Sequence, residues 1–113
     1  MTLTTEDLGD IPGVTAARLD EVLEPDGFGK FAILSASDKA FIQAGNDWQP
    51  TAACEAFMAA HDSDPWLLEY RECGRQFRAA GLVTLDQVRQ TFRSYLAGGP
   101  EWRTGFVWSE LEE

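Results

Sequence analysis

Histidine and cysteine, the side chains best suited to catalysis or metal binding, are scarce in this sequence. His61 is the only histidine, and it lies near Cys54, Asp62 and Asp64. These residue types can bind zinc, but their spacing matches none of the usual zinc patterns, and the run DSDP at 62–65 has ordinary loop composition. We therefore predict no metal site and no cofactor.

Cys73 is the other candidate nucleophile, because it lies between Arg71 and Arg75. No histidine is near it in sequence to act as a general base, so an incidental thiol in a turn is the simpler interpretation. The two cysteines form no CxxC pair, and the glycine runs GFG and GGP lack the spacing of a phosphate-binding loop. The sequence therefore predicts no catalytic residue.

Charged residues gather in the run WLLEYRECGRQFRA at 66–79, and a β-hairpin would position them. A three-residue loop would place like charges opposite each other, whereas a two-residue turn at 73–74 pairs Glu69 with Arg78. Gly74 supplies the positive φ that such a turn requires. We predict this second register, which gives the hairpin one apolar face and one polar face because side chains alternate along a strand.

The polar face of this hairpin is the best candidate for a functional surface. One interpretation is a ladder of exposed ion pairs, each worth about 0–1 kcal/mol, so that exchanging the charges of Glu69 and Arg78 would hardly change stability. The other is a protein interface, where arginine is enriched. Trp48 and Trp102 are added to the candidate contact residues because both are predicted to lie in loops. The candidate binding residues are therefore Gln43, Trp48, Glu69, Arg71, Gln76, Arg78 and Trp102.

Other segments indicate the elements around this hairpin. Strand-like runs at 30–36 and 40–45 flank the polar SASDK and predict a preceding hairpin. An insertion at 46–65 follows, and its Ala-rich run TAACEAFMAAH favours a short helix.

The C-terminal part of the chain carries the strongest helix signal. A capping box from Thr84 to Gln87 begins a run of apolar residues at helical spacing, and a closing strand is expected at 104–111. These elements predict an α+β fold: an antiparallel sheet of about five strands, covered on one face by the C-terminal helix, with a short helical insertion after the second strand.

The domain organisation expected from these patterns is simple. Residues 1–28 are predicted to form an acidic arm, with a short helix that is capped by Thr15 and ended by the run PDG at 25–27. Residues 29–113 are predicted to form a single α+β domain.

Composition limits the functional class. The chain is 44% hydrophobic and 25% charged, as in ordinary soluble domains, and its net charge of −10 would repel nucleic acid and favour a basic partner. No apolar run approaches the roughly 20 residues of a membrane helix, and the N-terminus is acidic where a signal peptide is basic. We therefore expect a cytoplasmic protein that contacts no membrane.

Five short runs follow one another along the chain: FAILS, FIQAG, LLEYRECGRQFRA, TLDQVRQTFRSYLAGGPEWR and GFVWSEL. Over 31–45 and 66–110, this succession resembles the immunity proteins of bacterial polymorphic toxin systems. Such proteins are cytoplasmic, commonly acidic, and bind a cognate toxin. The resemblance implies a non-catalytic protein that binds a basic toxin, with Gln43, Glu69 and Arg71 at the interface. Two alternatives stay open. One is a small enzyme or ligand-binding domain with a pocket between helix and insertion, and the other is self-association, for instance a homodimer formed through an edge at 104–111.

Overall fold

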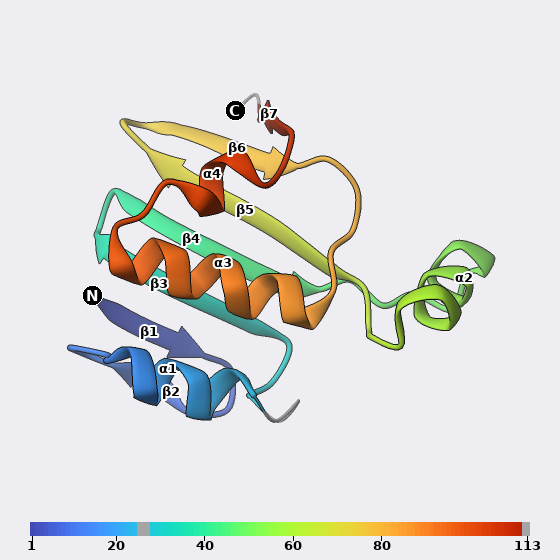
Figure 1. The fold of residues 1–113 in the computed structure, drawn as a ribbon, viewed down its shortest axis with the longest axis horizontal. Coiled ribbons are helices and arrows are strands. Elements are labelled where there is room, and N and C mark those ends of the chain that lie inside the picture. Colours follow the sequence, from blue (N-terminus) through green and yellow to red (C-terminus); the bar gives the residue numbers. More distant parts are fainter. Residues whose placement is uncertain (25–27, 112–113) are drawn as a thin grey trace.

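The computed structural model describes residues 1–24 and 28–111, which form an α+β fold (Figure 1). Within them, one open antiparallel sheet contains seven strands in the order β2-β1-β3-β4-β5-β6-β7. The predicted class and antiparallel sheet are confirmed, but the expected number of about five strands is too small. The strands are β1 (Thr2–Thr5), β2 (Gly9–Ile11), β3 (Phe31–Ser37), β4 (Ala40–Asn46), β5 (Trp66–Glu72), β6 (Arg75–Ala79) and β7 (Trp108–Glu110).

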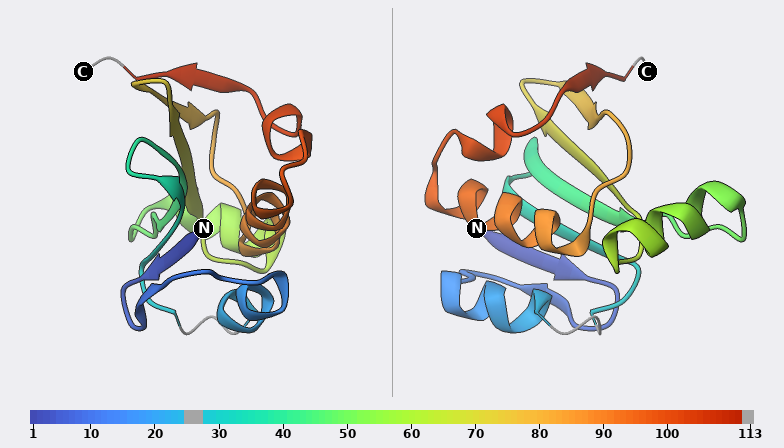
Figure 2. Two further views of the ribbon diagram at one scale, coloured as in Figure 1. Left: turned by 90° about the vertical axis from the view of Figure 1, so that its left-hand side faces the viewer. Right: turned by 45° about the vertical axis from the view of Figure 1, so that its right-hand side comes forward.

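Three helices cover one face of the sheet (Figure 2). They are α1 (Ala16–Leu23), α3 (Leu85–Ala97) and α4 (Glu101–Thr104). The core lies between them and the sheet, where Val88 and Phe92 of α3 are fully buried. No described helix covers the opposite face, which we call the open face. A fourth helix, α2 (Ala52–His61), stands beyond the ends of β4 and β5 (Figure 1). None of the described helices is long and apolar enough to span a membrane.

The N-terminal residues build one side of the sheet, so their prediction as an arm is wrong. β1 pairs with β3, β2 returns along β1 as an edge strand, and Leu3 is fully buried. The run TLTT is rich in the β-branched residues that favour strands. Leu3 is its only aliphatic residue, however, so the run shows no alternation of apolar and polar residues from which a strand could be predicted. Thr15 caps α1 as predicted, accepting from the Arg18 N–H at 3.2 Å. The predicted helix stop at 25–27 lies outside the described residues.

The strong helix signal corresponds to α3. The Thr84 hydroxyl accepts from the Gln87 N–H at 3.1 Å, and the Gln87 side chain accepts from the Thr84 N–H at 2.8 Å. Gly98 ends the helix with a φ of 77°, a conformation that favours glycine. The predicted capping box is therefore present and fixes where α3 begins.

The segment after α3 is only partly the strand that was expected at 104–111. A single helical turn, α4, comes first and ends at Gly105, and the strand itself spans only β7. Pro100 is the N-cap of α4, and its carbonyl accepts from the Arg103 and Thr104 N–H groups at 3.0 and 3.2 Å. The sequence therefore predicts that a closing strand is present but not that a helical turn precedes it.

Candidate protein-binding surface

The β5–β6 hairpin has the predicted register, with Glu69 opposite Arg78 and Glu72 opposite Arg75. Its turn contains Cys73 with a φ of 53° and Gly74 with a φ of 76°. Positive φ at both positions matches the tight turns that join antiparallel strands. Because side chains alternate, Glu69, Arg71, Gln76 and Arg78 share the open face of the sheet, whereas Glu72 and Arg75 lie on the face that the helices cover.

Glu69 is the centre of a hydrogen-bonded group on this face. Its Oε1 accepts from Gln43 Nε2 at 2.7 Å and from Gln76 Nε2 at 3.1 Å, and its Oε2 accepts from Arg78 Nε at 2.7 Å. The donors come from both neighbouring strands, since Gln43 of β4 and Arg78 of β6 lie directly opposite Glu69. We call these four residues the Glu69 cluster.

Glu69 is buried, with only 7% of the residue exposed, although it lies on the open face. The expectation of an exposed ion pair with Arg78 is therefore wrong. Long side chains from both neighbouring strands cover the carboxylate. Their hydrogen bonds replace those that it would make to water, and this offsets the free-energy cost of burying its charge. The carboxylate holds a guanidinium and two amides in fixed positions, and with both oxygens occupied it is poorly suited to proton transfer.

An apolar groove of about 340 Å³ runs beside the Glu69 cluster on the open face. Phe31, Ile33 and Leu67 line it, and Gln43 and Glu69 of the cluster form its polar wall. Antiparallel pairing places Gly45 directly between Phe31 of β3 and Leu67 of β5. The groove exists because glycine leaves space between two apolar side chains.

The sequence interpretation missed these groove residues. Residues 31–34 are apolar on both faces of the strand, so alternation does not reveal which face is core. Gly45 at the end of the next strand was the available signal, because glycine inside a strand often marks a close approach.

The remaining candidate contact residues lie in three separate places. Arg71 is half-buried on the open face, opposite Phe41 of β4. Trp48 is 50% exposed in the loop that joins β4 to α2. Trp102 belongs to α4, is 8% exposed and packs edge-on against Tyr70 at 4.8 Å. Its predicted position in a loop is wrong, and its burial leaves little surface for a partner.

The insertion that carries α2 is tied to the sheet at its base. The Asp47 N–H donates to the Pro65 carbonyl at 2.9 Å, and Asn46 Nδ2 donates to Asp64 Oδ2 at 3.0 Å. The Trp48 N–H donates to Asn46 Oδ1 at 2.9 Å. A shallow hollow of about 390 Å³ beside Trp48 is lined by Lys30, Asn46 and Asp64. These bonds hold Trp48 close to the end of the groove.

A polar hollow of about 450 Å³ lies between the end of α2 and the start of α3. It occupies the place of the pocket that was expected between helix and insertion. Among the described residues, no three His, Cys, Asp or Glu side chains come close enough to hold a metal ion. We call this hollow the acidic hollow; it is lined by His61, Asp62, Ser63, Asp64, Trp66, Thr84, Leu85, Asp86 and Arg89.

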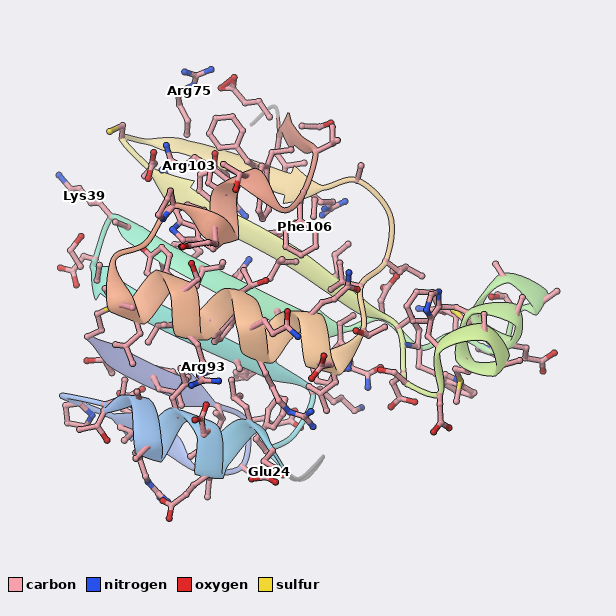
Figure 3. The ribbon with its side chains drawn as sticks, in the orientation of Figure 1. Glu24, Lys39, Arg75, Arg93, Arg103 and Phe106 are labelled. Carbon is pink, nitrogen blue, oxygen red and sulfur yellow. The ribbon has the colours of Figure 1, made fainter. Side chains whose placement is uncertain are left out.

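The shifted pKa values lie away from the open face. Burial raises the pKa of Tyr70 and of Tyr95, which belong to the aromatic packing between sheet and helices. At the outer edge of the sheet, a hydrogen bond from Arg75 lowers the pKa of the Glu110 carboxyl (Figure 3). These shifts reflect structural contacts and do not mark a reactive centre.

Comparisons of the chain with protein-family models, with curated proteins and with solved structures gave no match. A functional proposal therefore depends on the geometry of the open face and on the short motifs of the sequence.

Proposed function

We propose that this protein is a non-catalytic, cytoplasmic protein-binding domain, and that it acts as an immunity protein against a basic toxin. One observation supports the binding role best: an apolar groove lies beside a buried, fully hydrogen-bonded carboxylate, on a sheet face that no described helix covers. Apolar contacts surrounded by fixed polar groups are typical of the centre of protein interfaces.

Charge favours a basic partner. The net charge of −10 attracts a cationic protein during diffusional encounter and repels nucleic acid. An enzyme is the less favoured class, because Glu69, the carboxylate nearest the groove, already accepts hydrogen bonds on both oxygens. A general base needs an oxygen that can reach the substrate proton.

Binding to a cognate partner tests this proposal. We would capture the partner from source cells, or express the product of a toxin gene adjacent to the gene for this protein, and measure affinity by calorimetry. Leu67→Lys places a charge in the groove while its long stem reaches solvent. We expect the Kd to rise about 30-fold or more, as for a central contact, with little change in melting temperature.

Ala17→Lys provides the matched control, because Ala17 is exposed on α1, on the other side of the sheet. This variant should keep the affinity of the unmodified protein. Equal affinities for Leu67→Lys and Ala17→Lys would refute the role of the groove. Failure to bind the adjacent toxin, or to protect cells that express it, would refute the immunity function.

A further inference from the structure

The open sheet has two edge strands, β2 and β7, and they differ in how well they are protected. β2 carries Asp10 at its centre, and the chain turns at Gly9 and Gly13, whose φ values are 66° and 61°. A charge and a turned backbone both keep an edge from pairing with another chain. The charge of β7, on Glu110, is instead neutralised by Arg75, which donates to both carboxylate oxygens at 2.8 and 2.6 Å. Figure 2 shows no described element on the outer side of β7, which is therefore the less protected edge.

The outward-facing backbone groups of β7 belong to Trp108 and Glu110. The Leu111 N–H donates to the Gln76 carbonyl of β6 at 2.8 Å, and the Val107 carbonyl accepts a bond of the same length from the residue that follows β6. Every second residue of an antiparallel strand bonds to the same neighbour, so positions 107, 109 and 111 bond toward β6. Trp108 and Glu110 therefore direct their N–H and C=O groups away from the sheet, where another strand can pair with them.

Apolar side chains lie at both ends of this edge strand. Val107, directly before β7, is 74% exposed, more than any other large apolar side chain of the described residues. Leu111, directly after β7, is half-buried. Because side chains alternate, both point to the same side of the sheet as Ser109. An exposed aliphatic side chain next to unpaired backbone groups is typical of a contact surface, because pairing would remove both from water.

The run VWSEL at 107–111 is complementary to an antiparallel copy of itself. When Ser109 lies opposite Ser109 of a second copy, Val107 lies opposite Leu111, and Trp108 lies opposite Glu110. The outward N–H and C=O groups of Trp108 and Glu110 then bond to each other across the two copies. Aliphatic side chains meet at each end, and no like charges face each other. Both the backbone and the side chains of this edge therefore fit a second copy of the same strand.

We propose that two copies of this protein pair through β7, about a two-fold axis beside Ser109, so that their sheets join into one continuous antiparallel sheet. Copies that each carry a net charge of −10 repel each other in general, but at this edge Arg75 already neutralises Glu110. The same pairing at β2 would place Asp10 opposite its own copy as like charges, so one edge of each chain pairs and assembly stops at the dimer. The groove between β3 and β5 stays uncovered, and the dimer is independent of the toxin-binding role proposed above.

Sedimentation velocity of the unmodified chain tests whether it self-associates. A short edge pairing buries little area, so we expect a weak and reversible dimer, with a sedimentation coefficient that rises from the monomer toward the dimer value between about 0.01 and 1 mM. Over the same range, hydrogen exchange at the Trp108 and Glu110 amides should slow at least about threefold, because these outward N–H groups become donors. A chain that stays monomeric at the highest concentration would overturn the proposal.

Substitutions at Ser109 test the register, because this exposed residue lies opposite its own copy at the two-fold axis. Ser109→Glu and Ser109→Lys each place like charges opposite each other, and each should raise the dimer Kd about fivefold or more. Mixing the two variants places opposite charges there and should restore a mixed dimer with at least the affinity of the unmodified protein. Ala17→Glu, exposed on α1, changes the net charge as Ser109→Glu does and should alter the Kd less than about twofold.

Three results with these variants would count against pairing through β7: a dimer that survives both Ser109 substitutions, one that weakens equally with Ala17→Glu, or single variants that do not recover on mixing. A monomeric chain whose cognate partner loses affinity with Ser109→Glu would assign the edge to a strand of that partner instead of a second copy. Leu67→Lys should leave the dimer intact, and Ser109→Glu should leave the cognate partner bound. Failure of the groove proposal and failure of the dimer therefore appear in different variants.

Discussion

Arg78 and Glu69 face each other across β5 and β6, with Arg78 Nε 2.7 Å from Glu69 Oε2. The two side chains differ in environment, because 46% of the arginine side chain is exposed but only 10% of the glutamate side chain. The pair is therefore a buried carboxylate held by a half-exposed cation, rather than two equivalent surface charges.

Removing Arg78 should destabilise the protein more than the loss of a surface ion pair would. Arg78→Ala leaves the buried Glu69 carboxylate with two neutral amide donors, and we expect a loss of about 1–3 kcal/mol in the free energy of unfolding. Adding Glu69→Gln should recover part of that loss. Urea denaturation of both variants measures the difference, and a loss below about 0.5 kcal/mol for Arg78→Ala would show that the carboxylate is not buried in solution.

Exchanging the two charges should also be costly. Glu69→Arg with Arg78→Glu buries a guanidinium where two amide groups now donate inward, so we expect the melting temperature to fall by more than about 4 °C. The same exchange at Arg75 and Glu110 is the matched control, because these side chains are 61% and 43% exposed. That control should melt close to the unmodified protein. Similar melting temperatures for both exchanges would contradict the burial of Glu69.

Truncating a core side chain to alanine should reduce the free energy of unfolding more when that side chain is more deeply buried. Phe92 of α3 is fully buried, so Phe92→Ala should cost about 3–5 kcal/mol. Trp108 of β7 is only partly buried at the edge of the sheet, and Trp108→Ala should cost less. Thermal and urea unfolding give the ranking, and the opposite order would mean that α3 does not cover the sheet as described.

Both tyrosines of the chain should resist ionisation. Burial raises the pKa of Tyr70 and Tyr95, with the negative charge of Glu72 adding to the effect and Arg103 opposing it. The folded state thus favours the neutral phenols, so this contribution to stability is complete below about pH 10 and is lost as pH rises through the folded pKa values. Absorbance titration should show ionisation above pH 10 in the folded protein and near pH 10 in denaturant. A midpoint at or below 10 in the folded protein would contradict this.

The edge strand β7 should loosen in acid. The hydrogen bond from Arg75 lowers the pKa of the Glu110 carboxyl, although partial burial opposes the shift. The contribution of this pair is therefore present above the unfolded pKa of about 4.3 and is lost as pH falls through the lower folded value. Hydrogen exchange at β7 amides should accelerate below about pH 4, relative to β5 amides, after correction for intrinsic rates. Glu110→Gln should abolish this pH dependence, and an unchanged dependence in that variant would assign the effect to another group.

Local signals account for the elements that sequence predicts well. The capping box of α3 and the turn at Cys73-Gly74 each act within a few residues, so spacing alone places them. β1 was missed because its partner β3 lies about thirty residues away and supplies the pairing that its short Thr-rich run cannot indicate. α4 was missed because a single helical turn has almost no periodicity to detect.

The candidate site was predictable only in its polar half. Alternation within one hairpin placed Glu69, Gln76 and Arg78 on one face, as observed. The burial of Glu69 depends on Gln43 from another strand, and the groove depends on Gly45 lying between two further strands. Such properties arise from the order of strands across the sheet, which single-strand patterns do not contain.

The strand order also determines how the chain is exposed while it is being synthesised. Apart from β1 and β3, neighbouring strands in the sheet are consecutive in the chain, so the sheet can grow strand by strand from the ribosome. α3 follows β6 in sequence, and the apolar faces of Leu34, Ile42 and Leu68 stay uncovered until Ala97 has emerged. The nascent chain therefore carries its greatest aggregation hazard late in translation, because a chain that stops before α3 has an apolar sheet face that only α1 partly covers.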